Sequence, residues 1–370
     1  MNKLQTRDGK FKIVQFADIQ EIVWFSPDTE RLLRAVLEKE RPQLAVLTGD
    51  QIKGYGVSML GNARQKAETV LRRIISIFEE TNTPFTAVFG NHDEFREADK
   101  NFQWEIYKRS PMFVSGGKFL HDAGLFSLPV YGNDGQIQWN LYGFDSYVYD
   151  PARQKRANVP AAQQALYRAE RERLYAETGR YVPSLVFQHI PVPEVYQLMR
   201  AVPKRTKGAL RGAGQFSDVY YVLGDGVQPG GFMRENAAVL ENTGEFDALC
   251  EKGEVRGLFF GHDHINSFVG NYRGIDLCYT QGCGFNCYGP GLQRGARVIE
   301  LSEGAPGKYR TYTATYADLC GKKLQRPAVE IFYALAPPSI SVALDRGKKL
   351  AAAAAVIGAA VAVGKKLRKS

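Results

Sequence analysis

The stretch that decides the fold is KIVQFADIQ, residues 12–20. Residues 12–17 form a largely apolar run, which predicts a buried strand. The strand runs out at Asp18 and Gln20, and side chains two residues apart in an extended chain point the same way. A strand end of this kind can offer a carboxylate and an amide oxygen to one metal ion. The alternative is that the two residues form only the polar end of a strand.

Similar apolar runs follow at residues 43–47 and 84–89. Between the three runs, apolar side chains recur at helical spacing in residues 29–40 and 63–80, which predicts two amphipathic helices. The order strand–helix–strand–helix–strand implies right-handed crossovers and a parallel sheet. We therefore predict an α/β fold with a βαβαβ start.

Later apolar runs at residues 274–280, 296–301 and 310–315 are separated only by turns, which predicts an antiparallel portion. Residues 1–325 are expected to form one domain, and residues 326–370 a C-terminal extension.

The extension contains LAAAAAVIGAAVAVG, an uncharged run flanked by Lys and Arg. As a helix this run would span roughly 22 Å, less than the ~30 Å hydrocarbon core of a bilayer. Three interpretations stay open: a disordered or helical basic end, a membrane-surface or weak membrane anchor, and a helix that binds a partner.

Charge is concentrated in this tail. Residues 345–370 hold seven Lys or Arg and one Asp, so they contribute +6 of the formal net charge of +9. The remaining +3 does not indicate a nucleic-acid-binding face. Five cysteines do not suggest a disulfide framework, and the N-terminus MNKLQTRDGK lacks the apolar core of a signal peptide. We expect a cytoplasmic protein, with peripheral membrane contact through the tail as the alternative.

Polar motifs follow the predicted strands one after another. They are TGD, GNHDEF, QHIP and GHDH, in addition to the first strand end. Because sites in open α/β sheets form at the carboxyl ends of strands, we expect these motifs to meet at one rim. The residues that carry their chemistry are Asp18, Gln20, Asp50, Asn91, His92, His189, His262 and His264.

Carboxylate, amide and imidazole groups are ligands for first-row divalent metals such as Mn, Fe and Zn. Seven of the eight residues, all except His92, are too many for one ion and suit two ions that share a carboxylate. Two ions about 3.5–4 Å apart can hold a hydroxide and bind a phosphate between them. His92 is then not needed as a ligand. It is next to the predicted ligand Asn91 in the sequence, where it can act from outside the metal shells.

In order and spacing these motifs resemble the calcineurin-like metallophosphoesterases, whose pattern is D-x-H, GD, GNH-D/E, a lone His after a strand, and GH-x-H. The resemblance covers roughly residues 10–300. The segments VLTGDQIKGY and RGARVIEL resemble the corresponding sequences of the branch related to purple acid phosphatases. Lys53 stands where those enzymes have a metal-binding tyrosine, so the tyrosine is lacking. The resemblance implies two sheets packed as a sandwich and flanked by helices.

The resemblance also implies a role for each of the eight residues. The first metal ion would take Asp18, Gln20 and His264. The second would take Asn91, His189 and His262, and Asp50 would bridge the two. Asn91 and His92 would bind the substrate, and His92 would protonate the leaving oxygen. Gln20 departs from the pattern, which has histidine at this position.

The implied reaction is hydrolysis of a phosphate ester, foremost a monoester, by a hydroxide that bridges two divalent ions. One rival is a phosphodiesterase or nuclease on the same scaffold, which the weak charge of the body mildly disfavours. Another is a non-catalytic interaction module, which the near-complete ligand set disfavours. We interpret Cys278, Cys283 and Cys287 as packing or loop cysteines, and His121 as structural.

Overall fold

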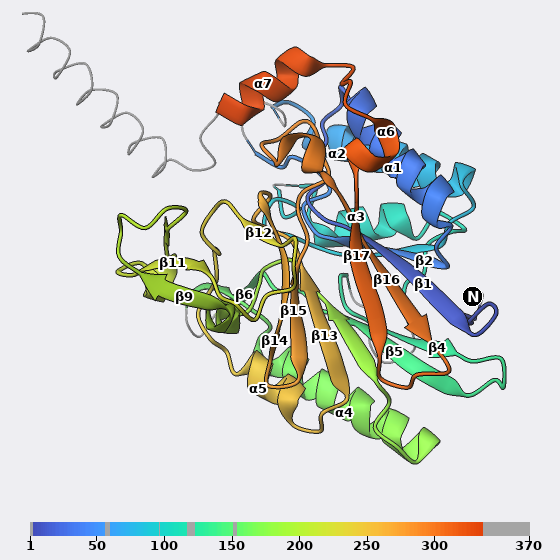
Figure 1. The fold of residues 1–370 in the computed structure, drawn as a ribbon. Coiled ribbons are helices and arrows are strands. Elements are labelled where there is room, and N and C mark those ends of the chain that lie inside the picture. The colour runs from blue at the N-terminus through green and yellow to red at the C-terminus, as the bar shows by residue number, and fades with distance from the viewer. Residues whose placement is uncertain (1–2, 56–59, 96, 117–122, 151–153, 336–370) are drawn as a thin grey trace, which may run out of the picture.

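The computed structural model describes residues 3–55, 60–95, 97–116, 123–150 and 154–335. Two β-sheets lie face to face, and helices cover the outer side of each (Figure 1). The predicted two-sheet α/β sandwich is therefore confirmed. His121 and most of the predicted extension lie outside the described residues.

The first sheet has the order β17-β16-β1-β2-β3. Strands β1, β2 and β3 run parallel, which confirms the predicted βαβαβ start, while β16 pairs antiparallel with both β1 and β17. The strands are β1 (Lys10–Phe16), β2 (Leu44–Thr48), β3 (Phe85–Val88), β16 (Gly295–Ser302) and β17 (Tyr309–Thr315).

The second sheet has the order β12-β14-β15-β13-β8-β5-β4. Its centre is parallel, since β13 runs parallel to both β8 and β15, and β5 runs parallel to β8. The strands are β4 (Phe126–Tyr131), β5 (Ile137–Gly143), β8 (Ser184–Phe187), β12 (Phe232–Met233), β13 (Val255–Phe260), β14 (Asn266–Tyr272) and β15 (Ile275–Tyr279).

The predicted antiparallel portion needs one correction. Strands β16 and β17 form an antiparallel pair as expected, but β15 belongs to the other sheet. The chain crosses from one sheet to the other over residues 280–294, and the antiparallel partner of β15 is β14. Polar residues and Gly270 interrupt the apolar pattern of β14, NSFVGNY, so the sequence did not predict this strand.

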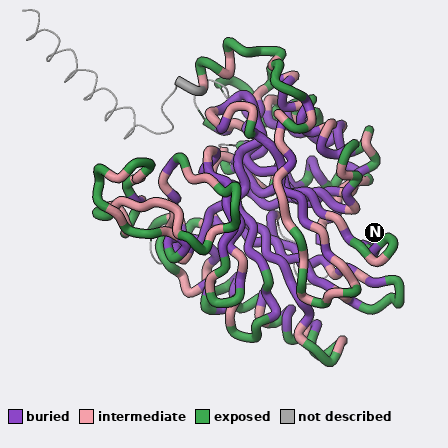
Figure 2. The backbone as a smooth tube through the Cα atoms, viewed as in Figure 1, coloured by how far each residue is buried: buried purple, intermediate pink, exposed green. Residues whose placement is uncertain are grey.

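Apolar side chains form three layers of core. Phe11 and Ile13 of β1 pack between the sheets with Leu185 of β8, whereas Val14 and Phe16 face the helices on the first sheet. This alternation follows from the two-residue period of a strand. Figure 2 shows the buried residues concentrated along the strands of both sheets.

Helices α1, α2 and α3 lie over the first sheet, and α4 and α5 over the second (Figure 1). Pro27 and the acidic Asp28 and Glu30 in the first turn favour the N-terminus of α1. The Asn62 side chain caps α2 by accepting a hydrogen bond from Gln65 N. The helices are α1 (Pro27–Glu40), α2 (Ala63–Glu80), α3 (Lys100–Tyr107), α4 (Ala161–Thr178) and α5 (Glu245–Cys250).

Smaller elements surround this frame. Helices α6 (Tyr316–Cys320) and α7 (Pro327–Leu335) follow the last strand, and Arg294 holds α7 by an ion pair with Glu330 at 2.9 Å. No helix among the described residues is both long and apolar enough to cross a bilayer. The remaining strands are β6 (Val148–Asp150), β7 (Lys155–Ala157), β9 (Met199–Val202), β10 (Leu210–Arg211) and β11 (Tyr220–Leu223). The 3-10 helices among the described residues are η2 (Pro193–Leu198), η3 (Gly214–Phe216) and η4 (Gly291–Gln293).

Candidate metal centre

The carboxyl ends of five parallel strands bring the predicted site residues together. Strands β1 and β3 of the first sheet end just before the DIQ and GNHD motifs, and β2 ends at the first residue of TGD. Strands β8 and β13 of the second sheet end just before QHIP and GHDH. One ligand atom each from Asp18, Asp50 and His189 lies within 4.8 Å of the other two, and all three residues are buried. The site therefore lies where the ends of the two sheets meet.

Three of the predicted ligands surround His189 Nε2. This nitrogen lies 3.1 Å from Asn91 Oδ1, 3.2 Å from His262 Nδ1 and 3.4 Å from Asp50 Oδ2. Asn91, His189 and His262, which come from three different strand ends, thus form one trio in contact with Asp50.

The other predicted ligands gather around His264 Nε2. It lies 3.3 Å from Asp18 Oδ1 and 3.3 Å from Gln20 Nε2. Gln20 Nε2 also donates a hydrogen bond to Asp50 Oδ2 at 3.0 Å. Asp18, Gln20 and His264 therefore form a second trio, and Asp50 contacts both.

Asp18 Oδ1 shows that this donor set fits a cation. The atom is buried and accepts no hydrogen bond, although His264 Nε2 is its neighbour. Leaving a buried carboxylate oxygen without a donor costs about 1–3 kcal/mol or more. A divalent ion among these oxygens and nitrogens would satisfy it.

The backbone fixes which ring nitrogens of two histidines face the centre. His189 Nδ1 lies 2.9 Å from Thr48 O, and His264 Nδ1 lies 2.8 Å from Tyr288 O. A carbonyl oxygen only accepts, so Nδ1 carries the proton in each ring. The Nε2 atoms are then the ones that face the carboxylates, the orientation of histidines that bind metals through Nε2.

The electrostatics of the histidines differ within the centre. Burial, together with the neighbouring His189, lowers the pKa of His262 to about 3. Burial also acts to lower the pKa of His189, but Asp50 and Asp18 outweigh it and raise that pKa to about 9. A metal ligand must be deprotonated, so a cation bound by His189 would have to displace its proton.

Backbone strain is concentrated at the same residues. Asp18, Gln20, Asp50 and His262 have φ angles of +54°, +39°, +53° and +74°. Residues held in this region cost about 1–3 kcal/mol each and persist only where the surroundings hold them. Local hydrogen bonds do so here, including His262 N to Asp18 Oδ2 at 3.0 Å and Gln20 N to Asp50 O at 2.8 Å.

Two motif glycines allow the backbone to approach the carboxylates. A Cβ atom on Gly90 would lie 2.1 Å from Asp50 Oδ1, and one on Gly261 would lie 2.6 Å from Asp18 Oδ2. Neither contact is compatible with a side chain, so the GN and GH dipeptides of the motifs have a steric reason.

Asp93 has a structural role that the sequence analysis missed. Its carboxylate accepts hydrogen bonds from the backbone N–H groups of Asp50, Gln51 and Gly90 at 2.6, 3.0 and 2.8 Å. It therefore ties the loop after β2 to the loop after β3. The GNHD motif contained the signal, but the sequence alone did not indicate which groups the carboxylate would bind.

His92 lies at the rim, with a third of its side chain exposed (33%). Its backbone N–H donates to Asp50 Oδ1 at 2.8 Å, while its Nε2 stays 3.9 Å from Asp50 Oδ2. Burial lowers the pKa of its imidazole. The ring is thus near the centre but outside both trios.

Tyr55 is a second residue that the sequence analysis missed. Its hydroxyl donates to Gln20 Oε1 at 3.0 Å, and its ring centroid lies 4.4 Å from that of His92. The sequence analysis looked for a tyrosine only at position 53, where Lys53 stands.

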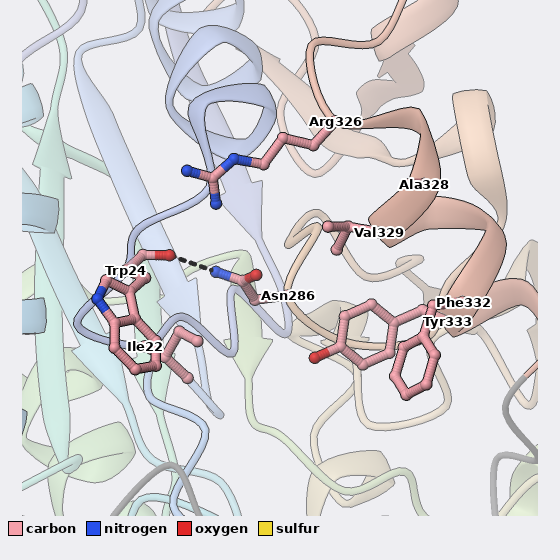
Figure 3. A pocket seen from close by; sticks show the side chains of 8 residues that line it. All are labelled: Ile22, Trp24, Asn286, Arg326, Ala328, Val329, Phe332 and Tyr333. Carbon is pink, nitrogen blue, oxygen red and sulfur yellow. Dashed lines mark hydrogen bonds between the residues drawn. The ribbon is translucent and has the colours of Figure 1, made fainter.

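A cavity of about 540 Å³ lies beyond this rim, between α7 and the loop that follows Gln20 (Figure 3). Lys53 Nζ donates to Asn286 O at 2.9 Å and to the Tyr333 hydroxyl at 3.0 Å, so it joins the loop after β2 to α7. The lining residues are Ile22, Trp24, Asn286, Arg326, Ala328, Val329, Phe332 and Tyr333.

The three clustered cysteines, Cys278, Cys283 and Cys287, are buried free thiols. Cys287 contacts the proposed ligand His264 and, against the effect of burial, its interaction acts to raise the pKa of that histidine. Cys283 belongs to the core between the first sheet and its helices.

Comparison with known proteins gives a family for this arrangement. A family model described as calcineurin-like phosphoesterase matches residues 11–266, the span that contains all eight predicted site residues. The chain is 26% identical to probable inactive purple acid phosphatase 29 of Arabidopsis thaliana, over 82% of this chain and 80% of that protein. It is also 26% identical to phosphatase DCR2 of Saccharomyces cerevisiae, over 80% of this chain and 52% of that protein.

Among solved structures, a dimetal phosphatase from Danio rerio has 14% identity and a TM-score of 0.47, covering 83% of this chain and 99% of that chain. The match of the family model over most of the chain decides the assignment. This chain belongs to the calcineurin-like phosphoesterase family.

Proposed function

We propose that this chain hydrolyses a phosphate ester, foremost a monoester, at a centre that holds two divalent metal ions. The observation that carries the proposal is the pair of trios that share the buried Asp50. Asp18, Gln20 and His264 would hold one ion. Asn91, His189 and His262 would hold the other, with Asp50 between them.

The residues of the chain have separate tasks in this proposal. When bound, the two ions supply a nucleophile near neutral pH and offset charge on the phosphate oxygens. Asp50 is held ionised because His189 and His92 lower its pKa, although burial alone would raise it. His92 at the rim contacts the phosphate with Asn91 and gives a proton to the leaving oxygen.

Imidazole nitrogen favours zinc and iron, and carboxylate and amide oxygens suit manganese. The mixed donor set therefore supports Mn, Fe or Zn as the occupant. The low charge of the chain outside its tail gives little support for a nucleic-acid diester as substrate.

One observation favours a second candidate function. One relative is named a probable inactive purple acid phosphatase. This name favours a second candidate, an interaction module that binds no substrate. Against it, six of the seven proposed ligand positions hold a side chain with a ligand atom directed at the centre, and the seventh, Gln20, presents its amide nitrogen there.

A direct assay separates these candidates. The purified chain is tested with p-nitrophenyl phosphate and with bis-p-nitrophenyl phosphate, each with added Mn²⁺, Fe²⁺ or Zn²⁺. We expect turnover of the monoester to exceed that of the diester, and Asp50→Asn to abolish it. Preference for the diester would favour the phosphodiesterase. Absence of both bound metal and turnover would favour the interaction module.

We also propose peripheral contact of the C-terminal extension with an anionic membrane surface. The Lys- and Arg-flanked run of residues 345–370 supports it, because basic residues near such a surface contribute about 1 kcal/mol each. Helix α7, which leads into this run, exposes the apolar side chains of Ile331 and Phe332.

A further inference from the structure

Tyr55 lies beside the metal centre on a loop that packs closely against His92. Gly54 lies against the GNHD loop so closely that a Cβ atom there would be 1.8 Å from the carbonyl oxygen of His92. The backbone of Lys53 is tied to Glu21 O at 3.0 Å. The residue that follows Gly54 is therefore held over both the first strand end and the GNHD loop.

Two contacts define what Tyr55 can do. Its hydroxyl is 3.0 Å from Gln20 Oε1, and its ring stacks in a tilted geometry on His92, with centroids 4.4 Å apart. Lys53 Nζ lies 5.2 Å from the centroid of the Tyr55 ring. Tyr55 thus contacts one proposed ligand and the proposed acid at the same time.

Gln20 presents a problem that histidine at the same position would not. Its amide has an oxygen that can bind a cation and an NH₂ group that cannot. In the structure, Nε2 points to Asp50 Oδ2 and His264 Nε2, while Oε1 points to Tyr55. A cation bound through Oε1 requires the amide to turn over.

A tyrosine hydroxyl suits both orientations of this amide because it can donate and accept. Without a cation it donates to Gln20 Oε1. With the amide turned, it accepts from the Nε2–H group, and the amide oxygen takes the place beside Asp50 and His264. The nitrogen then keeps a partner in a site where a lost hydrogen bond is expensive.

We propose that Tyr55 is the positioning residue of Gln20: its hydroxyl holds the amide with the oxygen toward the first metal ion. The inference rests on the proposed function in one respect, since it takes Gln20 as a ligand of that ion. Gln20, which departs from the family pattern, and Tyr55, which contacts it, are then a functional pair.

The test is a double-mutant cycle on metal binding without substrate. Mn²⁺ affinity and stoichiometry are measured by calorimetric titration and by electron paramagnetic resonance. Tyr55→Phe keeps the ring on His92 and removes only the hydroxyl. We expect the weaker of the two Mn²⁺ sites to lose about 10–100-fold in affinity, the usual effect of removing an outer-shell partner, while the other site is unchanged.

The second arm uses Gln20→His. An imidazole has no amide to orient, so adding Tyr55→Phe to Gln20→His should change Mn²⁺ affinity less than about 2-fold. Coupling of this kind between neighbouring positions is what a double-mutant cycle isolates. Tyr333→Phe is the matched control, because its hydroxyl contacts Lys53 and no proposed ligand; it should leave Mn²⁺ affinity as in the wild type.

The outcomes separate this inference from the proposed function. An equal loss on both backgrounds, or none in Tyr55→Phe, overturns the pairing of Tyr55 with Gln20 and leaves the reaction standing. Mn²⁺ binding that depends on Tyr55 in a protein without turnover supports the pairing and removes the reaction. A wild-type chain that binds no Mn²⁺ overturns both. Thermal unfolding of each variant shows whether its fold is intact.

Discussion

His189 Nε2 lies 3.4 Å from Asp50 Oδ2, and both side chains are buried. The other oxygen of Asp50 accepts the backbone N–H of His92 at 2.8 Å. The carboxylate is therefore fixed at one oxygen and directed by the other toward the two trios of proposed ligands. Its orientation depends on the loop after β3 as much as on its own strand.

The first prediction concerns this shared carboxylate. Asp50→Asn is nearly isosteric, but it removes the negative charge between the two proposed ions. We expect the purified variant to keep its fold and to lose most of the metal from both sites, measured by elemental analysis after dialysis. Asp276→Asn, a change in strand β15, is the control. Two equivalents of metal in Asp50→Asn would mean that Asp50 is not the bridging ligand.

The second prediction concerns His92, whose ring lies outside both trios. His92→Asn should lower turnover of a chromogenic monoester by about 10²–10⁴, the usual contribution of a general acid. Its metal content should stay near that of the wild type, because the ring fills neither metal shell. Loss of metal together with activity would make His92 a ligand and contradict the assignment.

The meeting of the proposed ligands at one place was predictable because of a simple geometric rule. Parallel strands in one sheet place their carboxyl ends at one edge, so Asp18, Asp50 and Asn91 had to meet once β1, β2 and β3 were recognised. The same rule predicted that His189 and His262 reach this point, but that they do so from a second sheet followed only from the family resemblance. No periodicity in the sequence predicts how two sheets face each other.

Other features could not be predicted from the sequence, for physical reasons. Tyr55 contacts Gln20 because Gly54 lets the loop press on His92, and backbone packing of this kind leaves no pattern in the sequence. The separation of β15 from β16 depends on a loop that crosses between sheets. Because β15 and β16 are neighbours in the sequence, they were predicted to pair, but tertiary contacts place them in different sheets.

The third prediction concerns Glu245, a carboxyl group buried in α5 far from the metal ligands in sequence. Burial, with the nearby Glu194 adding to it, raises the pKa of Glu245 from 4.5 to about 8. Between these values the folded state binds more protons than the unfolded state, so this group lowers stability as the pH rises from about 5 to 8. Glu245→Gln should therefore raise the unfolding temperature at pH 8 and change it little at pH 5.

A matched control for this effect lies on the same helix. Asp247 is exposed and paired with Arg273, so Asp247→Asn should leave the difference between pH 5 and pH 8 as it is in the wild type. If Glu245→Gln shifts the unfolding temperature equally at both pH values, the carboxyl group is ionised throughout this range and its burial has another compensation.

Trp24 offers a built-in probe for the last prediction. It is 77% exposed and lines the cavity beside α7 together with Phe332, which is 65% exposed (Figure 3). The other two tryptophans, Trp104 and Trp139, are only 5% and 1% exposed. A change in tryptophan emission on contact with a surface would therefore come mainly from the face formed by Trp24 and α7.

The fourth prediction combines this probe with the basic tail. The full chain should co-sediment with vesicles that contain phosphatidylserine and shift its emission to shorter wavelength, because Lys and Arg attract the headgroups and Trp24 leaves water. Deleting residues 346–370 should abolish both effects at physiological salt and leave hydrolysis of small substrates unchanged. Trp24→Phe should sediment with the vesicles but show no shift. If the full chain and the deletion variant sediment equally, the tail does not bind the membrane; sedimentation without a shift would confine the contact to the tail.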